Sequence, residues 1–317
     1  MAVYVLKRLI AALPVIFLTT AIVFVLMRML PGDPVLMLIG EAQGNVSDEA
    51  IAAMRKQQGI DQPIYAQYIA WIGKLAAGDF GRSILSRQPV WDILRPRILP
   101  TMHIGLTAWF LAILISVPLG IAGARAQNSW KDMLGTIASL IGAAMPFFLT
   151  GGLLIYVVAL KGRLLPASGY VAPFVDPWAS IKTTILPALT LTIWLSASVT
   201  RQVRSSFIDV LRHAYIKTAR AKGLAEGRVV YDHALKNAML PVVTILGIQL
   251  SSLFSGTVIT ETIFAVPGVG RLLVDSILSR DYPVVQAVVL FLALTVVVAN
   301  LMVDICYGLL DPRTRES

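Results

Sequence analysis

The sequence predicts an all-α polytopic membrane protein, and three observations lead to that class. The 317-residue chain is 56% hydrophobic and only 14% charged, whereas about a quarter of a soluble globular domain is charged. It contains six uncharged runs, each long enough to cross a bilayer as a helix. Lys and Arg are concentrated in alternate loops. The six runs are residues 9–27, 98–124, 133–160, 183–200, 237–260 and 282–303.

The distribution of Lys and Arg predicts the orientation. With the N-terminus inside, the inner segments hold 14 of these residues and the short outer loops hold five. Because such residues stay on the cytoplasmic side of short loops, we expect a multi-pass protein of the bacterial inner membrane with both termini in the cytoplasm. The net charge of +9 is then explained by orientation and by contact with anionic membrane lipid, rather than by nucleic acid.

The first run is predicted to be a retained span. Lys7 and Arg8 precede it as they would a signal peptide, but no small-residue cleavage site follows. Residues 31–34, Pro-Gly-Asp-Pro, end the helix. The outer region that follows reaches residue 97, with an amphipathic helix starting near Ser47 and a second, aromatic helix over residues 64–75 suited to the membrane surface. Residues 1–97 therefore form one unit, too small and amphipathic to include an enzyme domain.

The core is predicted over residues 98–311, followed by a cytoplasmic tail over residues 312–317. Within the core, the segment 201–240 is longer and more basic than a plain connection requires. Ile208, Leu211 and Tyr215 have the spacing of one apolar helix face. A short helix with small residues and cations follows and stops at Gly223 in a left-handed turn.

This helix is predicted to lie across the cytoplasmic ends of the spans and to dock into a groove of a soluble partner protein. A solvated connector is the alternative, although it would not need such a pattern. The residues expected to contact the partner are Tyr215, Lys217, Thr218, Ala219, Arg220, Ala221, Lys222 and Gly223.

The last outer loop, residues 261–281, is apolar and contains a Pro-Gly turn before a short helix over residues 271–280. Apolar, non-helical backbone beside a membrane is tolerated where it is buried in protein or lines a cavity. Two interpretations stay open: the turn dips toward the path across the membrane, or it is a surface cap. If the turn dips toward this path, we expect Gly268 to need a positive φ. The candidate residues are Glu261, Phe264, Pro267 and Gly268.

The chain lacks the common catalytic and nucleotide-binding motifs. Its three histidines do not form a His-Glu-x-x-His pair, and there is no Gly-x-Ser-x-Gly elbow or Gly-x-x-x-x-Gly-Lys-Ser/Thr loop. We therefore expect no catalytic residue, no metal and no cofactor. A single cysteine, Cys306, excludes an internal disulfide. Asp304 is the one carboxylate within a predicted span, near its cytosolic end. Intramembrane acids are functional candidates, but a structural pairing is the preferred interpretation.

Several motifs of the chain resemble those of the permease subunits of bacterial binding-protein-dependent ABC importers, in the dipeptide, oligopeptide and nickel group. The stretch Lys217–Gly223 is similar to that superfamily's Glu-Ala-Ala-x-x-x-Gly coupling motif: Ala219 and Gly223 match, whereas Lys217 and Thr218 depart from it. Further similar strings are Leu30-Pro-Gly-Asp-Pro34, Gly78-Asp-Phe-Gly81, Ile185-Leu-Pro187, Glu261-Thr-Ile-Phe264, Pro267-Gly-Val-Gly-Arg271 and Arg280-Asp-Tyr-Pro-Val-Val-Gln286.

The resemblance implies a type I importer fold and one half of a heterodimeric pore, completed by a second, related permease. It also implies two cytoplasmic ATPase subunits, a periplasmic solute-binding protein and transport by alternating access. A short peptide is the expected substrate, with glutathione, a nickel chelate or an opine-type compound as alternatives. A secondary transporter is the alternative from another class, and it would need coupling-ion groups in the spans.

Overall fold

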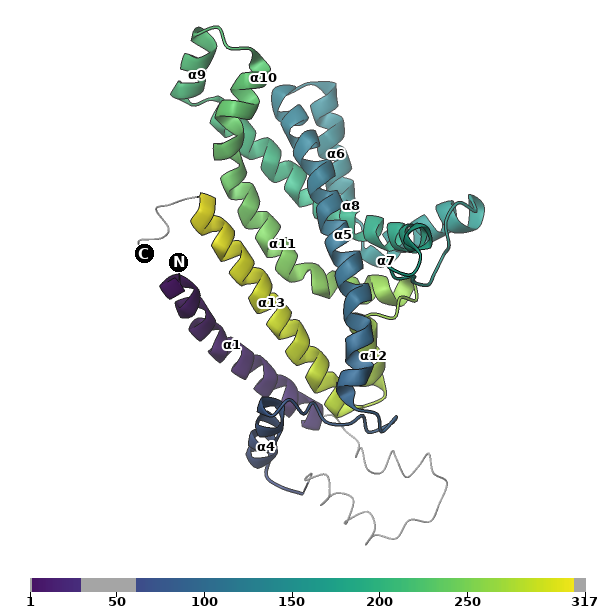
Figure 1. Cartoon of the computed structure of the whole chain (residues 1–317). Helices are drawn as coiled ribbons and strands as arrows, with labels where there is room; N and C mark the ends of the chain where they lie inside the picture. The colour runs from purple at the N-terminus through teal and green to yellow at the C-terminus, as the bar shows by residue number, and fades with distance from the viewer. Residues whose placement is uncertain (1, 30–60, 311–317) are drawn as a thin grey trace.

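The computed structural model describes residues 2–29 and 61–310, which are mostly helical. In this part of the chain the one β contact is an isolated bridge between Arg82 and Pro89. Figure 1 shows a splayed bundle of long helices with short helices at both ends. The elements are α1 (Ala2–Met29), α4 (Ile64–Ala76), α5 (Val90–Arg125), α6 (Trp130–Ala144), α7 (Phe147–Leu154), η1 (Ile155–Lys161), α8 (Pro177–Leu211), α9 (Ala214–Ala221), α10 (Glu226–Arg228), η2 (Val229–Ala234), α11 (Leu235–Ile263), α12 (Val269–Leu278) and α13 (Tyr282–Leu310).

The centre of the bundle is formed by α5, α8 and α11, which pack along much of their lengths. Small residues allow the close approach: a Cβ placed on Gly120 of α5 would lie 2.6 Å from the Val203 side chain of α8. Polar side chains then join neighbouring helices, as is common in membrane bundles. Gln249 donates from Nε2 to the Leu195 carbonyl oxygen at 2.9 Å, and the Trp109 indole donates to the Leu246 carbonyl oxygen at 3.1 Å.

The surface of the long helices is apolar, as lipid contact requires. Among the described residues, five helices are long and apolar enough to cross a membrane: four lie within α1, α5, α8 and α13, and the fifth runs from Glu226 of α10 through η2 into α11 as far as Leu253. Leu13 and Phe17 of α1 and Leu114 of α5 are among the large hydrophobic side chains that stay more than half exposed. The fourth predicted run, residues 183–200, is the shortest of the six and contains Pro187, yet its helix α8 is 35 residues long and well packed.

The third predicted run, residues 133–160, is not one straight helix. It is divided into α6 and the α7–η1 segment, which are bent by 106° at the break. Met145 is extended there, with ψ at 123°, as the residue before Pro146 tends to be. A hydropathy scan cannot register this bend, since the run carries no charged residue on either side of it.

The bent pair still carries the chain from one end of the bundle to the other. It begins beside the α5–α6 turn, and the loop that follows it reaches the opposite end, where the Gly169 amide donates to the Phe264 carbonyl oxygen at 2.9 Å. Counted as one span, it brings the total to the predicted six. In Figure 1 α9 and α10 lie at one end and α4 and α12 lie at the other.

The helix predicted over residues 64–75 is confirmed as α4. Its Tyr68 ring lies against Phe17 and Phe24 of α1, with ring centroids 5.7 and 5.2 Å apart, whereas Tyr65 and Ile69 stay exposed. Arg28, at the end of α1, stacks over the Phe24 ring and donates from Nε to Gln67 Oε1 at 2.6 Å. The predicted Pro-Gly-Asp-Pro turn and the helix from Ser47 lie outside the described residues.

Candidate functional site

The predicted basic helix is present as α9, but it is not continuous with the helix before it. α8 ends at Leu211 and α9 begins at Ala214, with His213 extended between them. The expected single face of Ile208, Leu211 and Tyr215 is therefore wrong, because the first two lie on α8 and Tyr215 lies on α9. Tyr215 is exposed, and its hydroxyl accepts a hydrogen bond from Asn237 Nδ2 at 2.8 Å.

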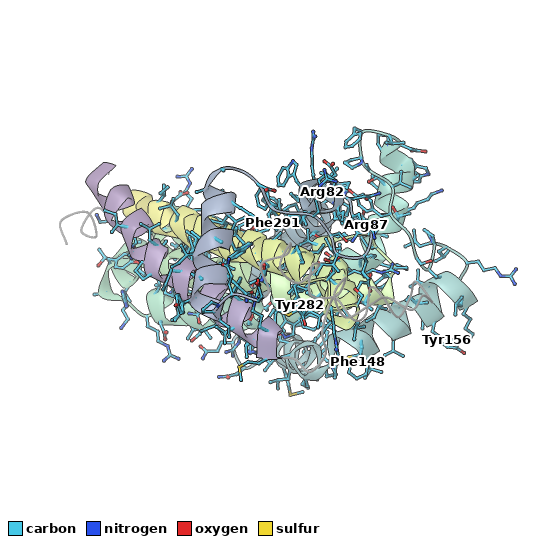
Figure 2. The ribbon with its side chains drawn as sticks, turned by 90° about the horizontal axis from the view of Figure 1, so that it is seen from below. Arg82, Arg87, Phe148, Tyr156, Tyr282 and Phe291 are labelled. Carbon is cyan, nitrogen blue, oxygen red and sulfur yellow. The ribbon has the colours of Figure 1, made fainter. Side chains whose placement is uncertain are left out.

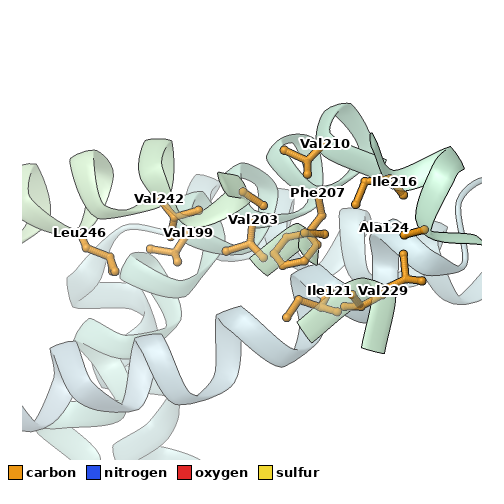
Figure 3. Packing of buried hydrophobic residues seen from close by; sticks show 14 residues of the cluster. Ile121, Ala124, Val199, Val203, Phe207, Val210, Ile216, Val229, Val242 and Leu246 are labelled. Atoms are coloured by element: carbon orange, nitrogen blue, oxygen red, sulfur yellow. The ribbon is translucent and has the colours of Figure 1, made fainter. Parts of the chain in front are cut away.

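One face of α9 packs against its own chain. Ile216 and Ala219 are buried together with Phe207 of α8 and Val229 and Val230 of η2 (Figure 3). The expectation that Ala219 offers its small side chain to a partner protein therefore needs correction. Its spacing of three residues from Ile216 places both on the inward face of the helix.

The opposite face of α9 is free within the chain and consists of small and basic side chains. Ala214, Lys217, Thr218 and Ala221 recur at the spacing of one helical face, and all four are exposed. Lys222 follows at the helix end and is exposed too. This face, which we call the α9 outer face, is formed by Ala214, Lys217, Thr218, Ala221 and Lys222.

Two local features hold α9 in place. Gly223 has a φ of 78°, in the left-handed region that favours glycine, and a Cβ there would meet no atom within 4 Å. The predicted left-handed turn is therefore present, and only its backbone conformation requires glycine. Across this turn, Arg220 forms two hydrogen bonds with Glu226, at 2.7 and 3.1 Å. This contact raises the pKa of the Arg220 guanidinium.

The second predicted site, at the other end of the molecule, is a buried turn between α11 and α12. Glu261 and Phe264 are at most 1% exposed, and Gly268 is buried, whereas Pro267 is exposed. Gly268 has a φ of −101°, so the expected positive φ is wrong. Glycine is required there for another reason: a Cβ would overlap the carboxyl group of Glu261.

The Glu261 carboxylate explains the geometry of this turn. Its Oε1 accepts a hydrogen bond from the Thr101 hydroxyl at 2.6 Å, and its Oε2 accepts one from the Arg271 amide at 2.9 Å. The Thr101 hydroxyl oxygen in turn accepts a hydrogen bond from the Val269 amide at 2.8 Å. The carboxylate and the hydroxyl thus satisfy free amides in the first turn of α12 and fix α12 to α5 and α11.

A second carboxylate connects the loop before α5 to the same end of the bundle. Asp281, buried just before α13, accepts hydrogen bonds from the Ser83 hydroxyl and from the Ile84 amide. Seen from that end in Figure 2, Tyr282 lies near the centre of the molecule, and Arg82 and Arg87 lie above it. Two strings that are far apart in sequence, residues 78–83 and 280–286, therefore form one structural unit.

Three of the residues that form these hydrogen bonds could not be identified from the sequence. Thr101, Ser83 and Asp281 form bonds that span 160 to 198 positions, and no local spacing indicates such pairs. The Asp132–Arg204 pair also spans a long stretch of sequence, 72 positions, with bonds of 2.5 and 2.7 Å between α6 and α8.

Asp304 lies within α13, but its side chain is outside the described residues. In the part of the chain that the structure describes, no group of three or more His, Cys, Asp or Glu could hold a metal ion.

Comparison with known proteins identifies the family. Residues 116–316 match the model of the binding-protein-dependent transport system inner membrane component, and residues 1–105 match the model of its N-terminal part. The glutathione transport system permease proteins GsiC of Salmonella typhimurium and Escherichia coli K12 are each 41% identical to this chain over 313 residues, which cover 98% of both chains.

A solved structure supports the fold. The inward-facing MetNI methionine ABC transporter superposes on 69% of this chain and 96% of the matched chain, with a TM-score of 0.58 and 15% sequence identity. Together with the family models, which cover both the N-terminal region and the helical core, this likeness confirms the resemblance inferred from the motifs. The chain belongs to the binding-protein-dependent ABC importer permeases, as a multi-pass subunit of the inner membrane.

Proposed function

We propose that this permease subunit imports a short peptide of the glutathione class and that α9 couples it to cytoplasmic ATPase subunits. The observation that carries the coupling assignment is the α9 outer face. A helix whose apolar side is buried in its own chain, and whose other side is small and basic, can receive a partner without rearranging. Small side chains at Ala214, Thr218 and Ala221 allow close approach of a partner's surface.

The local bonds of α9 suit a coupling role. Ile216 and Ala219 fix the helix to α8 and η2, and the Arg220–Glu226 pair fixes the turn after it. Since η2 leads directly into α11, a displacement of α9 is passed to a long helix of the bundle. η2 is a π-helical turn, a geometry that is often found at functional positions.

The substrate class rests on the relatives rather than on a pocket. The similar permeases are named for glutathione, and the similarity extends over nearly the whole chain. Glutathione is itself a tripeptide, so it lies within the short-peptide class that the motifs indicate. We further propose that a second, related permease completes the pore, that a periplasmic solute-binding protein delivers the substrate, and that both termini lie in the cytoplasm with α9.

The first experiment tests coupling. Ala221→Glu places a carboxylate on the exposed α9 outer face, away from the buried side of the helix, so the permease should fold and reach the membrane. We expect the ATPase subunits to be lost on purification and uptake to fall at least tenfold. Ser205→Glu adds the same charge to the exposed surface of α8 at the same end of the bundle and serves as the matched control.

Substrate is tested in the same membranes with labelled glutathione and a labelled dipeptide. Saturable uptake of glutathione that depends on this chain supports the proposal, and uptake of the dipeptide alone rejects its substrate part. If Ala221→Glu retains both the ATPase subunits and full uptake, the coupling assignment of α9 is wrong.

A further inference from the structure

A separate pocket, of about 190 Å³, lies between α5, α6 and α8 and is not used by the coupling site or by the turn between α11 and α12. Its wall includes the three cations Lys131, Arg201 and Arg204 and one carboxylate, Asp132. Small residues of α5 and α6 provide the space. A Cβ placed on Gly135, which lines the pocket, would meet no atom within 4 Å.

The pocket has an excess of positive charge. Asp132 is 5% exposed and binds the Arg204 guanidinium through both carboxylate oxygens, at 2.5 and 2.7 Å, so these two charges offset each other. Arg201 donates from Nη1 to the Ser139 carbonyl oxygen at 3.4 Å, a neutral and long contact. Arg201 and Lys131 therefore keep two positive charges that favour an anion.

The cations lie at the level where the hydrocarbon ends. The uncharged run of α5 ends just before Arg125, and that of α8 ends just before Arg201. The run of α6 begins just after Asp132. At this level Trp130 is 66% exposed, with the Lys131 ammonium 5.8 Å from its ring centre, and exposed tryptophans are typical of the boundary between lipid tails and headgroups.

The surroundings of the pocket are apolar and exposed. Leu119 of α5 lines the pocket and is 55% exposed, and the small apolar residues Ala122 of α5 and Ala126, just after this helix, also form part of its wall. An anion bound by Arg201 and Lys131 would thus have hydrocarbon contacts directly beside it. A free inorganic anion would leave those apolar side chains unused, whereas a lipid would cover them with its acyl chains.

From this arrangement we infer that the α5–α6–α8 pocket is a binding site for an anionic phospholipid. The phosphate group lies between Arg201 and Lys131, and the acyl chains run along Leu119 and the exposed face of α6. Basic pockets between transmembrane helices on the cytoplasmic side commonly bind such headgroups. The lipid would brace α6 against α8 next to the Asp132–Arg204 pair.

The test uses the full-length chain, with the subunits that copurify, in nanodiscs of phosphatidylcholine to which phosphatidylglycerol with the same acyl chains is added. Retained lipid is counted by native mass spectrometry, and thermal unfolding is followed in parallel. We expect selective retention of phosphatidylglycerol and a higher unfolding midpoint. Arg201→Gln should reduce the preference for phosphatidylglycerol about fivefold, the effect of one cation near a membrane surface.

A second variant keeps the test decisive if Arg201→Gln does not fold. Gly135→Leu preserves every charge, fills open space and suits a helix better than glycine, and it should displace the lipid. The matched control is Lys182→Gln, since the Lys182 ammonium lies 5.2 Å from the Trp178 ring centre at the start of α8 and does not line this pocket. The Lys182→Gln variant should retain phosphatidylglycerol as the wild type does.

Three results would overturn the inference. The first is equal retention of phosphatidylglycerol by the wild type and by Gly135→Leu. The second is equal stabilisation by inorganic phosphate, which would indicate a soluble anion. The third is a photo-crosslinker at Gly135 that captures another protein subunit instead of lipid, since a partner protein would then cover the pocket.

Discussion

At the scale of single residues, the contact between Gly268 and Glu261 determines the geometry of the turn between α11 and α12. The carboxylate needs to reach the first turn of α12, and only a residue without a Cβ leaves it room. We predict that Gly268→Ala lowers the free energy of unfolding by about 1–3 kcal/mol, the usual cost of overpacking a tight site. Thermal unfolding of the detergent-solubilised protein measures the change.

The control for this variant is Gly73→Ala in α4. Its new methyl group meets no atom within 4 Å, so it should be neutral or slightly stabilising. The double variant Gly268→Ala/Glu261→Ala removes the overlapping carboxylate and should be less destabilised than the sum of the two single changes. Additive effects would show that the two residues do not interact.

The residue scale also shows the limit of sequence reasoning. Gly223 was correctly predicted in a left-handed turn, because a glycine that follows a short helix has few other uses. Gly268 was selected as important, but for the wrong reason. Its partner Glu261 lies seven positions away across a non-helical turn, and sequence spacing alone does not reveal which atoms meet there.

At the scale of elements, the Asp132–Arg204 pair joins α6 to α8. Asp132 also accepts a hydrogen bond from the Asn128 amide at 3.1 Å, so the carboxylate holds the α5–α6 turn as well. Removing the Asp132 carboxylate charge leaves the Arg204 guanidinium without its ion-pair partner. We predict that Asp132→Asn lowers the unfolding midpoint, with a loss of about 1–3 kcal/mol, as for a buried hydrogen-bonding group left unpaired.

The double variant Asp132→Asn/Arg204→Gln keeps side chains of similar size without an isolated charge. It should regain part of the lost stability, because an uncompensated charge costs more than a missing pair. A cysteine cross-link between α6 and α8, formed less readily in Asp132→Asn, would report the loosening directly. Identical stability of the single and double variants would assign no role to the charge.

The lengths of elements were easier to predict than their directions. An uncharged run of membrane length has few alternatives to a spanning helix, so all six runs are found in helices. The bend between α6 and α7 depends on Pro146 and on packing, where Gly142 approaches the Ile193 carbonyl and Gly151 approaches Phe264. Likewise, the burial of Ala219 depends on η2, whose approach to α9 no pattern in the sequence indicates.

At the scale of the whole molecule, the two ends of the bundle differ in chemistry. One end holds α9 and the basic α5–α6 turn, and the other holds α4, α12 and the buried carboxylates Glu261 and Asp281 (Figure 1). The helical sides between them are apolar: Phe148 and Tyr156, on the bent pair, lie at the edge of the molecule in Figure 2 and are 64% and 57% exposed. A membrane therefore fits around the sides.

The orientation of these ends is tested with single cysteines in a Cys306→Ala background. We predict that Gln62→Cys, just before α4, reacts in intact spheroplasts with a membrane-impermeant maleimide, because Lys and Arg are sparse in the short loops at that end. Gly227→Cys in α10 is exposed, with no atom within 4 Å of its added Cβ. It should react only after the membrane is permeabilised.

A third position decides whether the bent α6–α7 pair is a complete span. Leu164 lies just after η1 and is 73% exposed, and its loop reaches the Phe264 end of α11 through the Gly169 hydrogen bond. Leu164→Cys should therefore react from outside, like Gln62→Cys. Labelling of Leu164→Cys only after permeabilisation would make the bent pair a re-entrant segment and reduce the number of spans to five, which would place the two termini on opposite sides of the membrane.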